Sequence, residues 1–579
     1  SKINTDELND MPVSNITQKL QGKFSGVQIL NNSGEPNGNL SIRIRGQASI
    51  NGGNSPLVVI DGFPTSSGLE SLSPDEIESI SILKDAASTT LYGSRAANGV
   101  ILVTTKQGKK GKTNITLTAN YGIESVSNRG MPDVMNAQEF AQFKKEYYED
   151  AQKYEGSTTP VPSIYTNPSS VQDGTNWYKV LLRTAHSQNY NLGLQTGTEV
   201  VKSAVNVNYN DTEGTVINSY SKRLSMRSNN EFKASDRITF GLNLSGSYIK
   251  EQVQDNLGID RQIIGSAFLM DPQLKYKNDD GTYPISFNQP GMFGNPNWYL
   301  VLRDRENPIK RIRGTATGYA EIKILDGLKY RISGNGDVGN VSQEKWVPSW
   351  VSGAMFSAPP NPAYGSYYTY NYYTWLVENM LTYKKTFLGV HDVDVLLGYS
   401  AQKSNDISST INASDYADDA VGFFNAATTK VGSGDKSTWA MASWLARLNY
   451  EYKNKYILSL SFRRDGCSRF GSNARWANFP SVSGGWVMSE ENFMKKYEDI
   501  SFLKLRASWG KVGNNNIGNY PSIASVSTTN YVNNGAIVAG RQLNGIGNSD
   551  LTWETTKSWD IGLDLGLFND RIYFMYDYY

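Results

Sequence analysis

Strict alternation of apolar and polar residues over long segments constrains this sequence more than any other feature. Within residues 238–249 the apolar members of the pattern are Ile238, Phe240, Leu242, Leu244 and Tyr248. The same period of two recurs at 456–463, 503–509 and 560–567. Because successive side chains of a β-strand point to opposite faces, each segment predicts a strand with one apolar and one polar face. A soluble sandwich also contains such strands, so alternation alone leaves both a sandwich and a membrane barrel open.

The connections between these segments fall into two groups. Very short turns are expected at 197–199, 235–236, 326–327, 454 and 569–570. Long loops are expected between Ile249 and Arg311 and over the aromatic segment 346–373. Short turns at one end and long loops at the other are typical of an outer-membrane barrel, whose strands need about ten residues to cross the bilayer. Aromatic residues near strand ends match an interfacial girdle; they are Tyr209, Tyr248, Tyr450, Tyr452 and Trp509.

Composition narrows the class of protein further. Charged residues make up 19% of the chain and the formal net charge is +1, so no strong field indicates a nucleic-acid partner. Mean hydropathy is −0.46, and no stretch reaches the roughly 20 apolar residues of a membrane helix, which leaves a barrel as the way to cross. Cys467 is the only cysteine, so an internal disulfide is excluded. The first residues, SKINTDELND, show no signal-peptide pattern, and the compartment cannot be deduced from them.

The region before residue 112 has a different pattern, with short strands mixed with short helices. Residues 41–45 alternate like a strand, Leu57–Ile60 is a short apolar strand, and 100–105 reads as another. Residues 73–76, Ser-Pro-Asp-Glu, predict a helix start. The lysine- and glycine-rich hinge GKKGK at 108–112 closes the region. We therefore expect an α/β plug domain at 1–112 and a transmembrane β-barrel at 113–579.

Several separate blocks of this sequence resemble the SusC-type (SusC/RagA-like) TonB-dependent outer-membrane transporters. Two blocks resemble the plug, LQGKFSGVQILNNSGEPNGNLSIRIRGQASINGGNSPLVVIDGFP and LSPDEIESISILKDAASTTLYGSRAANGVILVTTKQGKKGK. Three further blocks, at 463–494, 503–522 and 551–579, resemble the barrel of that family. Cys467 departs from the serine that the family usually has there, and we expect little consequence.

The resemblance implies a fold, a location and a function. The complete barrel would have about 22 antiparallel strands with the plug in its lumen, in the outer membrane of a Gram-negative bacterium of Bacteroidota type. The function would be TonB-dependent import of glycan or peptide fragments, with a SusD-like surface lipoprotein as a lid, outer-membrane lipid around the barrel and no cofactor. This chain contains roughly fifteen strands, and a barrel ending at Tyr579 would leave an unpaired edge in lipid. We therefore expect the last strands and the N-terminal segment that contacts TonB to lie outside it.

Motifs for enzyme chemistry are weak. Residues 334–339, GNGDVG, match the dinucleotide fingerprint but lie inside a strand pattern without a following helix. HExxH and GxSxG are absent, and His186 and His391 lie in separate β regions. We expect no catalytic site and no metal site.

Charged residues of the plug are expected to hold it inside the barrel, because buried charges must be paired. Candidates for these plug–barrel contacts are Arg43, Arg45, Lys84 and Asp85, with Arg95 beside them. Inward barrel positions that could supply partners are Arg463, Arg506, Asp560 and Asp564. We favour this structural role over direct binding of a ligand.

Plug loops that face outward are expected, by the resemblance, to meet the cargo. These loops are 33–39, 48–55 and 94–98, and their polar side chains are Glu35, Asn37, Ser49, Asn51, Asn54, Arg95 and Asn98. Such groups suit sugar hydroxyls or a peptide backbone. They are also common turn residues, so a purely structural role stays open. The aromatic residues of YGSYYTYNYYTW at 364–375 could stack on sugar rings or form a girdle.

Three classes of function remain. Energised import is favoured, because a porin has no plug. A passive porin or structural outer-membrane barrel is the alternative, and a secreted glycan-binding or glycan-cleaving β-protein is the third.

Overall fold

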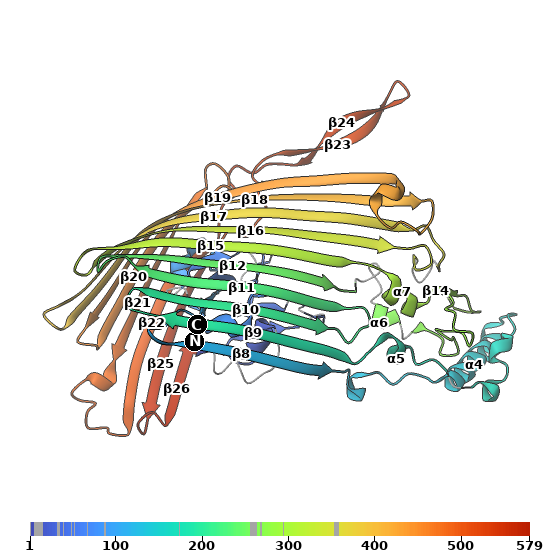
Figure 1. Cartoon of the computed structure of the whole chain (residues 1–579), viewed down its shortest axis with the longest axis horizontal. Helices are drawn as coiled ribbons and strands as arrows, with labels where there is room; N and C mark the ends of the chain where they lie inside the picture. Colours follow the sequence, from blue (N-terminus) through green and yellow to red (C-terminus); the bar gives the residue numbers. More distant parts are fainter. Residues whose placement is uncertain are drawn as a thin grey trace.

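A curved sheet of fifteen antiparallel strands is the largest sheet in the described part of the computed structural model (Figure 1). Each strand pairs with the one before it in the sheet, so the order is β26-β25-β22-β21-β20-β19-β18-β17-β16-β15-β12-β11-β10-β9-β8. The strands in chain order are β8 (Gly111–Glu124), β9 (Ala185–Gly197), β10 (Val201–Glu213), β11 (Tyr220–Lys233), β12 (Ile238–Gln252), β15 (Pro308–Leu325), β16 (Leu328–Val347), β17 (Tyr364–Phe387), β18 (His391–Tyr416), β19 (Ala427–Tyr452), β20 (Tyr456–Cys467), β21 (Trp476–Val487), β22 (Ile500–Asn514), β25 (Glu554–Leu567) and β26 (Ile572–Tyr578).

The structure describes most of the chain. The described residues are 2–4, 15–31, 35–36, 38, 40–47, 49–50, 52–65, 68–85, 89–172, 174–254, 263–266, 269–292, 294–352 and 358–579. Two of the expected cargo residues, Asn37 and Asn51, lie outside this set. Within it, no helix has the length and apolar character needed to cross a bilayer.

Short turns join the strands at one end of the sheet, where the sequence predicted them. Asn569 and Asp570 between β25 and β26, and Asn454 between β19 and β20, have positive φ. Tight hairpin turns require such a conformation, and Asn, Asp and Gly adopt it at little cost. The five predicted short turns lie at connections between consecutive strands, although Gly197 of the first still belongs to β9.

Long connections occupy the opposite end, called here the long-loop side. They carry α4 (Ala137–Glu155), α5 (Trp177–Leu181), α6 (Ile263–Ser266), α7 (Trp298–Asp304), the short pair β13 (Ser286–Phe287) and β14 (Asn295–Pro296), and the projecting hairpin of β23 (Ser525–Asn533) and β24 (Ala536–Gly545) (Figure 1). Buried Trp177, Met270 and Trp298 form an apolar core between these loops. The predicted loop at 346–373 was too long: β16 runs to Val347 and β17 begins at Tyr364. Residues 364–373 form ladder pairs with both neighbouring strands, so most of the aromatic segment is strand.

The apolar residues of the alternating segments lie on the outer face of the barrel strands, and the polar residues lie on the inner face. Phe240, Leu242 and Leu458 are 46%, 47% and 38% exposed, as residues facing lipid would be. Asn243 lines a small cavity shared with Asp61 of the plug, so it faces the lumen. Ser459 belongs to the same face as Arg463, which contacts the plug. The apolar face predicted from the alternation is therefore the outer face, and the polar face is turned to the lumen.

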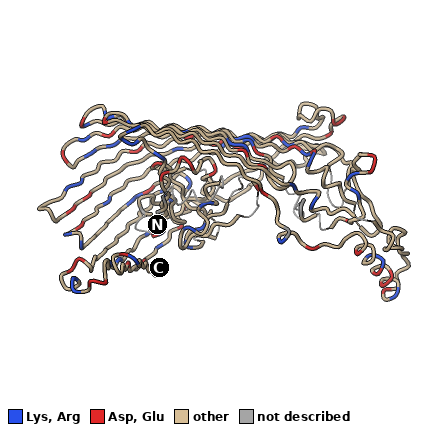
Figure 2. The backbone as a smooth tube through the Cα atoms, turned by 60° about the horizontal axis from the view of Figure 1, so that its bottom comes forward, with Lys and Arg blue, Asp and Glu red and all other residues tan. Residues whose placement is uncertain are grey.

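The N-terminal region forms a compact α/β unit on the concave side of the sheet (Figures 1 and 2). Its five-stranded sheet has the order β1 (Lys2–Asn4), β6 (Ile77–Leu83), β7 (Val100–Thr105), β4 (Leu57–Ile60) and β5 (Phe63–Thr65), with β4 and β7 parallel. A hairpin of β2 (Val27–Leu30) and β3 (Ser41–Ile44), the helix α2 (Ile16–Lys19) and the 3-10 turns η1 (Pro74–Glu76) and η2 (Thr90–Arg95) complete it. Ile16, Leu20, Ile77, Ile80 and Ile101 form its buried core. The predicted plug-and-barrel fold is confirmed.

Candidate functional site: the plug–barrel interface and the plug loops

An arginine–aspartate pair on β20 holds the tip of η2. Arg463 Nε lies 2.7 Å from Asp465 Oδ1, and Arg463 Nη1 donates to the carbonyl oxygen of Leu91 at 2.5 Å. The other carboxylate oxygen, Asp465 Oδ2, accepts from the backbone N–H of Ser94 at 2.9 Å. Gly93 between them has φ +56°, and a Cβ there would lie 2.5 Å from both side chains. The wall therefore contacts the plug backbone directly, and only glycine fits at this position.

Two further bonds connect this tip to neighbouring strands. Arg95 Nη1 donates to Gln402 Oε1 of β18 at 2.6 Å. Burial lowers the pKa of Arg95 to about 10, which still leaves it charged at neutral pH. The backbone N–H of Asn515, just after β22, donates to the carbonyl oxygen of Ser94 at 3.1 Å. The 94–98 turn therefore faces the wall as well as the lumen.

A second buried cluster lies at mid-height, where Arg227 of β11 meets two plug carboxylates. Arg227 Nε is 2.7 Å from Glu76 Oε2, and Nη1 is 3.8 Å from Asp61 Oδ2. Both acids are occupied inside the plug as well. Glu76 accepts from the backbone N–H of Ser73 in the capping box of η1, and Asp61 accepts from the N–H and hydroxyl of Thr105. The charges are paired, as burial requires.

Two other wall arginines bind the plug through neutral oxygens. Arg313 of β15 pairs with Asp337 of β16 at 2.8 Å and also donates to the hydroxyls of Ser71 and Thr65. Arg223 of β11 donates to the carbonyl oxygens of Glu70 and Leu72, each at 3.0 Å. Cavities of about 30 and 100 Å³ remain between plug and wall, and polar side chains line both. Such spaces suit water.

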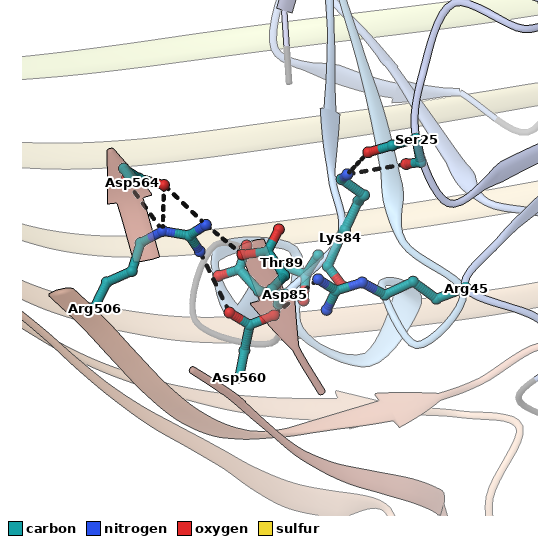
Figure 3. Close-up of polar contacts among 9 residues, drawn as sticks. Ser25, Arg45, Lys84, Asp85, Thr89, Arg506, Asp560 and Asp564 are labelled. Atoms are coloured by element: carbon teal, nitrogen blue, oxygen red, sulfur yellow. Dashed lines mark hydrogen bonds and ion pairs between the residues drawn. The ribbon is translucent and has the colours of Figure 1, made fainter. Parts of the chain in front are cut away.

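The contact expected of Arg45 is made with β25 (Figure 3). Arg45 Nη2 is 2.8 Å from Asp560 Oδ2 of β25, and its guanidinium lies over the ring of Tyr579 at 3.8 Å. Arg506 of β22 binds Asp560 and Asp564, at 3.4 and 3.2 Å, and also Asp577. The plug cation and the wall cation therefore share the Asp560 carboxylate.

The remaining charged candidates are placed differently. Lys84 Nζ donates to the carbonyl oxygen and hydroxyl of Ser25, at 3.0 and 3.2 Å, within the plug (Figure 3). Burial lowers the pKa of Lys84. The carbonyl oxygen of Asp85 accepts from Thr89. Arg43 lies in β3 opposite Gln28. Their role as plug–barrel contacts stays a prediction.

The plug loop before β4 is organised by the residues expected to meet cargo. The side chain of Asn54 accepts from the backbone N–H of Ser49 at 3.0 Å and donates to its carbonyl oxygen at 2.9 Å. Asn98 Nδ2 donates to the carbonyl oxygen of Gly53 at 2.7 Å and so joins two of the three expected loops. Ser49 and Asn98 are 6% and 8% exposed. The carbonyl oxygen of Glu35 accepts from Gly38 in the first loop.

A polar cavity of about 590 Å³ opens beside these loops. Its lining includes Asn15, Gly38, Ser41, Ser55 and Glu70. Glu70 is adjacent to the Arg223 contact, and the β11 end that begins at Tyr220 belongs to the long-loop side. Part of the cavity lining therefore lies near the end of the sheet that carries the long loops.

Sequence reasoning missed the arginines of β11 and β15. A signal was present, since every second residue from 221 to 229 is polar and includes two arginines. Such a row indicates that this face of the strand is turned inward and contacts charged or hydrogen-bonding groups. Which plug atoms it meets depends on the strand order.

The fold and this interface match one class of protein, the TonB-dependent outer-membrane receptors, in which a plug lies inside a barrel. Residues 1–100 match the TonB-dependent Receptor Plug Domain family. The chain is 33% identical over its whole length to TonB-dependent receptor P3 of Formosa agariphila, of which it covers 56%. It is 28% identical over 98% of its length to TonB-dependent receptor SusC of Bacteroides thetaiotaomicron, of which it covers 57%.

A solved structure, that of the RagAB peptide transporter, superposes with a TM-score of 0.86 at 25% identity, over 99% of this chain and 66% of that one. The chain is thus similar in sequence to TonB-dependent receptors, SusC among them, and similar in fold to the RagAB peptide transporter. It spans little more than half the length of the two curated relatives. The proteins it resembles are named receptors and transporters.

Proposed function

We propose that this chain is the plug and part of the barrel of an active importer of oligomeric nutrients, namely glycan or peptide fragments. A SusD-like surface lipoprotein would act as the lid, and TonB would supply the energy. The observation that carries the proposal is the plug itself, which lies in the concavity of the barrel sheet. A passive porin needs an open lumen, so this alternative is not favoured.

The chemistry of the interface supports a plug that moves. Hydrogen bonds and ion pairs join the plug to the wall at Arg45, Arg227, Arg313 and Arg463. Polar contacts next to water-sized cavities can exchange partners with water during a displacement, whereas a dry apolar contact would lose its stabilisation at once. A pull on the plug could therefore open a path without unfolding the barrel.

Cargo would bind on the long-loop side of the plug. The proposed contacts are the loop residues Glu35, Asn37, Ser49, Asn51, Asn54, Arg95 and Asn98. The 590 Å³ polar cavity beside two of these loops supports this position, because it can hold several hydroxyl or amide groups of a ligand.

The test uses the full-length transporter with its lid in cells. Uptake of a labelled oligosaccharide or peptide mixture is measured with TonB present, with TonB depleted and with the proton gradient dissipated. We expect uptake to stop in the last two conditions. Uptake that continues without TonB would show a passive barrel and overturn the proposal.

A further inference from the structure

Tyrosines of β17 alternate between the two faces of the barrel wall. Thr374 is 7% exposed and pairs with Asp337, whose carboxylate binds the Arg313 that contacts the plug. This side of β17 therefore faces the lumen, and Tyr372, Tyr370 and Tyr368 follow on the same face. Tyr373 and Trp375, on the other face, are 51% and 40% exposed. We call Tyr368, Tyr370 and Tyr372 the tyrosine ladder.

The ladder extends from the plug toward the long loops. Gln402 of β18, which binds the plug residue Arg95, pairs with Leu376 of β17. Arg313 of β15, which also contacts the plug, is in register through Gly339 with Tyr372. Tyr372 therefore lies at the edge of the plug contacts, and Tyr370 and Tyr368 lie about 7 and 14 Å further along the strand. β17 and β18 also reach further toward the long-loop side than β10 to β12 do (Figure 1).

The rings are held in fixed positions. The ring of Tyr372 lies against Gly339 of β16, where an added Cβ would come within 2.3 Å of it. A glycine at this position lets the ring lie across the backbone of the neighbouring strand, with its other face directed to the lumen. The rings of Tyr370 and Tyr372 have centroids 5.8 Å apart at an interplanar angle of 34°. Two adjacent flat apolar surfaces result.

A carboxylate accompanies these rings. Tyr370 Oη donates to Asp406 Oδ1 of β18 at 3.0 Å. Among the described residues, no donor is within hydrogen-bonding distance of the second oxygen, Oδ2. Asp406 pairs with Tyr372 across the two strands, so its free oxygen lies beside the ladder. The group can accept a hydrogen bond from a ligand.

Aromatic faces with one hydrogen-bond acceptor fit a sugar better than a peptide. The axial C–H groups of a pyranose carry partial positive charge and stack on the negative face of an aromatic ring. An extended peptide binds best along an unpaired strand edge, and β17 is paired along its length with both β16 and β18. The carboxylate disfavours an anionic ligand.

We propose that the tyrosine ladder and Asp406 form a binding subsite for the pyranose rings of a neutral oligosaccharide. The inference rests on the proposed import function and names its cargo class. Tyr370 and Tyr372 stack on successive sugar rings, and Asp406 accepts a hydroxyl hydrogen bond. The subsite lies on the wall before the plug loops, where a chain arriving from the long-loop side would pass first.

The experiment measures binding by calorimetry to the purified full-length transporter with its lid. The probes are neutral hexasaccharides of α- and β-linked glucose, xylose, mannose and galactose, and a tryptic digest of casein. The variant Tyr370→Ala/Tyr372→Ala is compared with Tyr373→Ala, which removes a tyrosine of the outer face of the same strand. Tyr370→Phe keeps the ring and loses only the bond to Asp406. Heat-modifiable migration and lid retention show that each variant is assembled.

We expect at least one hexasaccharide to bind, with affinity about tenfold or more lower in the double variant, from the loss of two stacking contacts. Tyr373→Ala should bind like the parent, and Tyr370→Phe within about threefold of it. The proposal is wrong if no hexasaccharide binds, whether or not peptides do, or if the double variant binds as the parent does. A separate uptake assay distinguishes failure of the subsite from failure of the import function. If the transporter still takes up some nutrient in a TonB-dependent way, only the subsite is wrong. If no TonB-dependent uptake is found, the import function itself is wrong.

Discussion

Arg227 Nε of the barrel wall lies 2.7 Å from Glu76 Oε2 of the plug, and both side chains are buried, at 10% and 4% exposure. The same Glu76 carboxylate closes the capping box of η1 through Ser73. One carboxylate therefore serves both the local structure of the plug and its attachment to the wall. Losing the wall partner is expected to affect the plug without affecting the barrel strands.

Replacing Arg227 by Ala should destabilise the docked plug by about 3–5 kcal/mol, because Glu76 and Asp61 would keep buried charges without a cation. The loss of plug stability is measured by heating the protein in detergent and recording the protease sensitivity of residues 15–105. The double variant Arg227→Met/Glu76→Gln removes both charges of the 2.7 Å pair, leaves Asp61 with its bonds from Thr105, and should recover part of the stability. A double variant as unstable as the single one would argue against the pair as the cause.

Gly93→Ala should loosen the tip of η2. The new methyl group would meet Arg463 and Asp465 at 2.5 Å, in addition to the strain of φ +56°. Gly62→Ala is the matched control, since Gly62 has φ +89° and no heavy atom within 4 Å of the added Cβ. The control should lose about 1–2 kcal/mol from backbone strain, and Gly93→Ala clearly more, in the same unfolding assay. Equal losses would mean that the close approach to the wall is unimportant.

Arg45→Ala should weaken the contact between plug and β25, because it removes the 2.8 Å pair with Asp560. Arg43→Ala, two residues earlier on β3, is the comparison. The expected effect is faster release of the plug from the wall in urea for Arg45→Ala, measured by hydrogen exchange of β3 and β25. If Arg43→Ala has the larger effect, the assignment of the wall contact to Arg45 is mistaken.

Leu242→Arg should impair assembly of the barrel by about 2–4 kcal/mol, because it places a charge on the lipid face near mid-strand. Asn243→Arg faces the lumen and should assemble far better, although its charge next to Arg227 and Arg313 can disturb plug docking. Assembly of both variants is measured by folding them into lipid vesicles and scoring the folded fraction by heat-modifiable gel migration. Similar assembly of the two variants would contradict the orientation of β12.

Asn54→Ala should reduce cargo uptake while barrel assembly and lid binding stay unchanged. It removes two hydrogen bonds that hold the loop from Ser49 to Asn54, each contributing about 1 kcal/mol. The double change of Asn51 and Asn54 to Ala should have a larger effect. Uptake of labelled cargo in cells is the measurement. If uptake is normal on every nutrient that depends on this transporter, the loop is structural and cargo binds elsewhere.

Much of the fold was predictable because it depends on local patterns. The period-2 segments gave the strands, and Asn454 and Asn569-Asp570 marked tight turns, since positive φ suits few residues. Leu57–Ile60 and Val100–Thr105 were recognisable as buried strands of the plug. The aromatic segment was assigned to a loop because its tyrosines hide the alternation: they occupy both faces of β17.

The partners of the charged residues were not predictable in the same way. Arg45 meets Asp560, more than 500 positions away in the chain, whereas Lys84 binds Ser25 inside the plug. Both are cations on the plug surface, and nothing in their neighbouring residues separates them. The arginines of β11 were visible as a polar row, but their plug partners were not.

The sequence by itself determined most of the segments that form strands, which of their faces is apolar, where several tight turns lie and that a mixed α/β unit precedes the barrel. These properties follow from residue spacing and backbone preferences, which act over a few positions. Only the tertiary structure decided that Arg227 meets Glu76, that Gly93 lies against Arg463, and that Tyr370 and Tyr372 face the lumen. The reason is physical: a shift of one residue in strand register exchanges the two faces, and the position of the plug depends on the whole curved sheet.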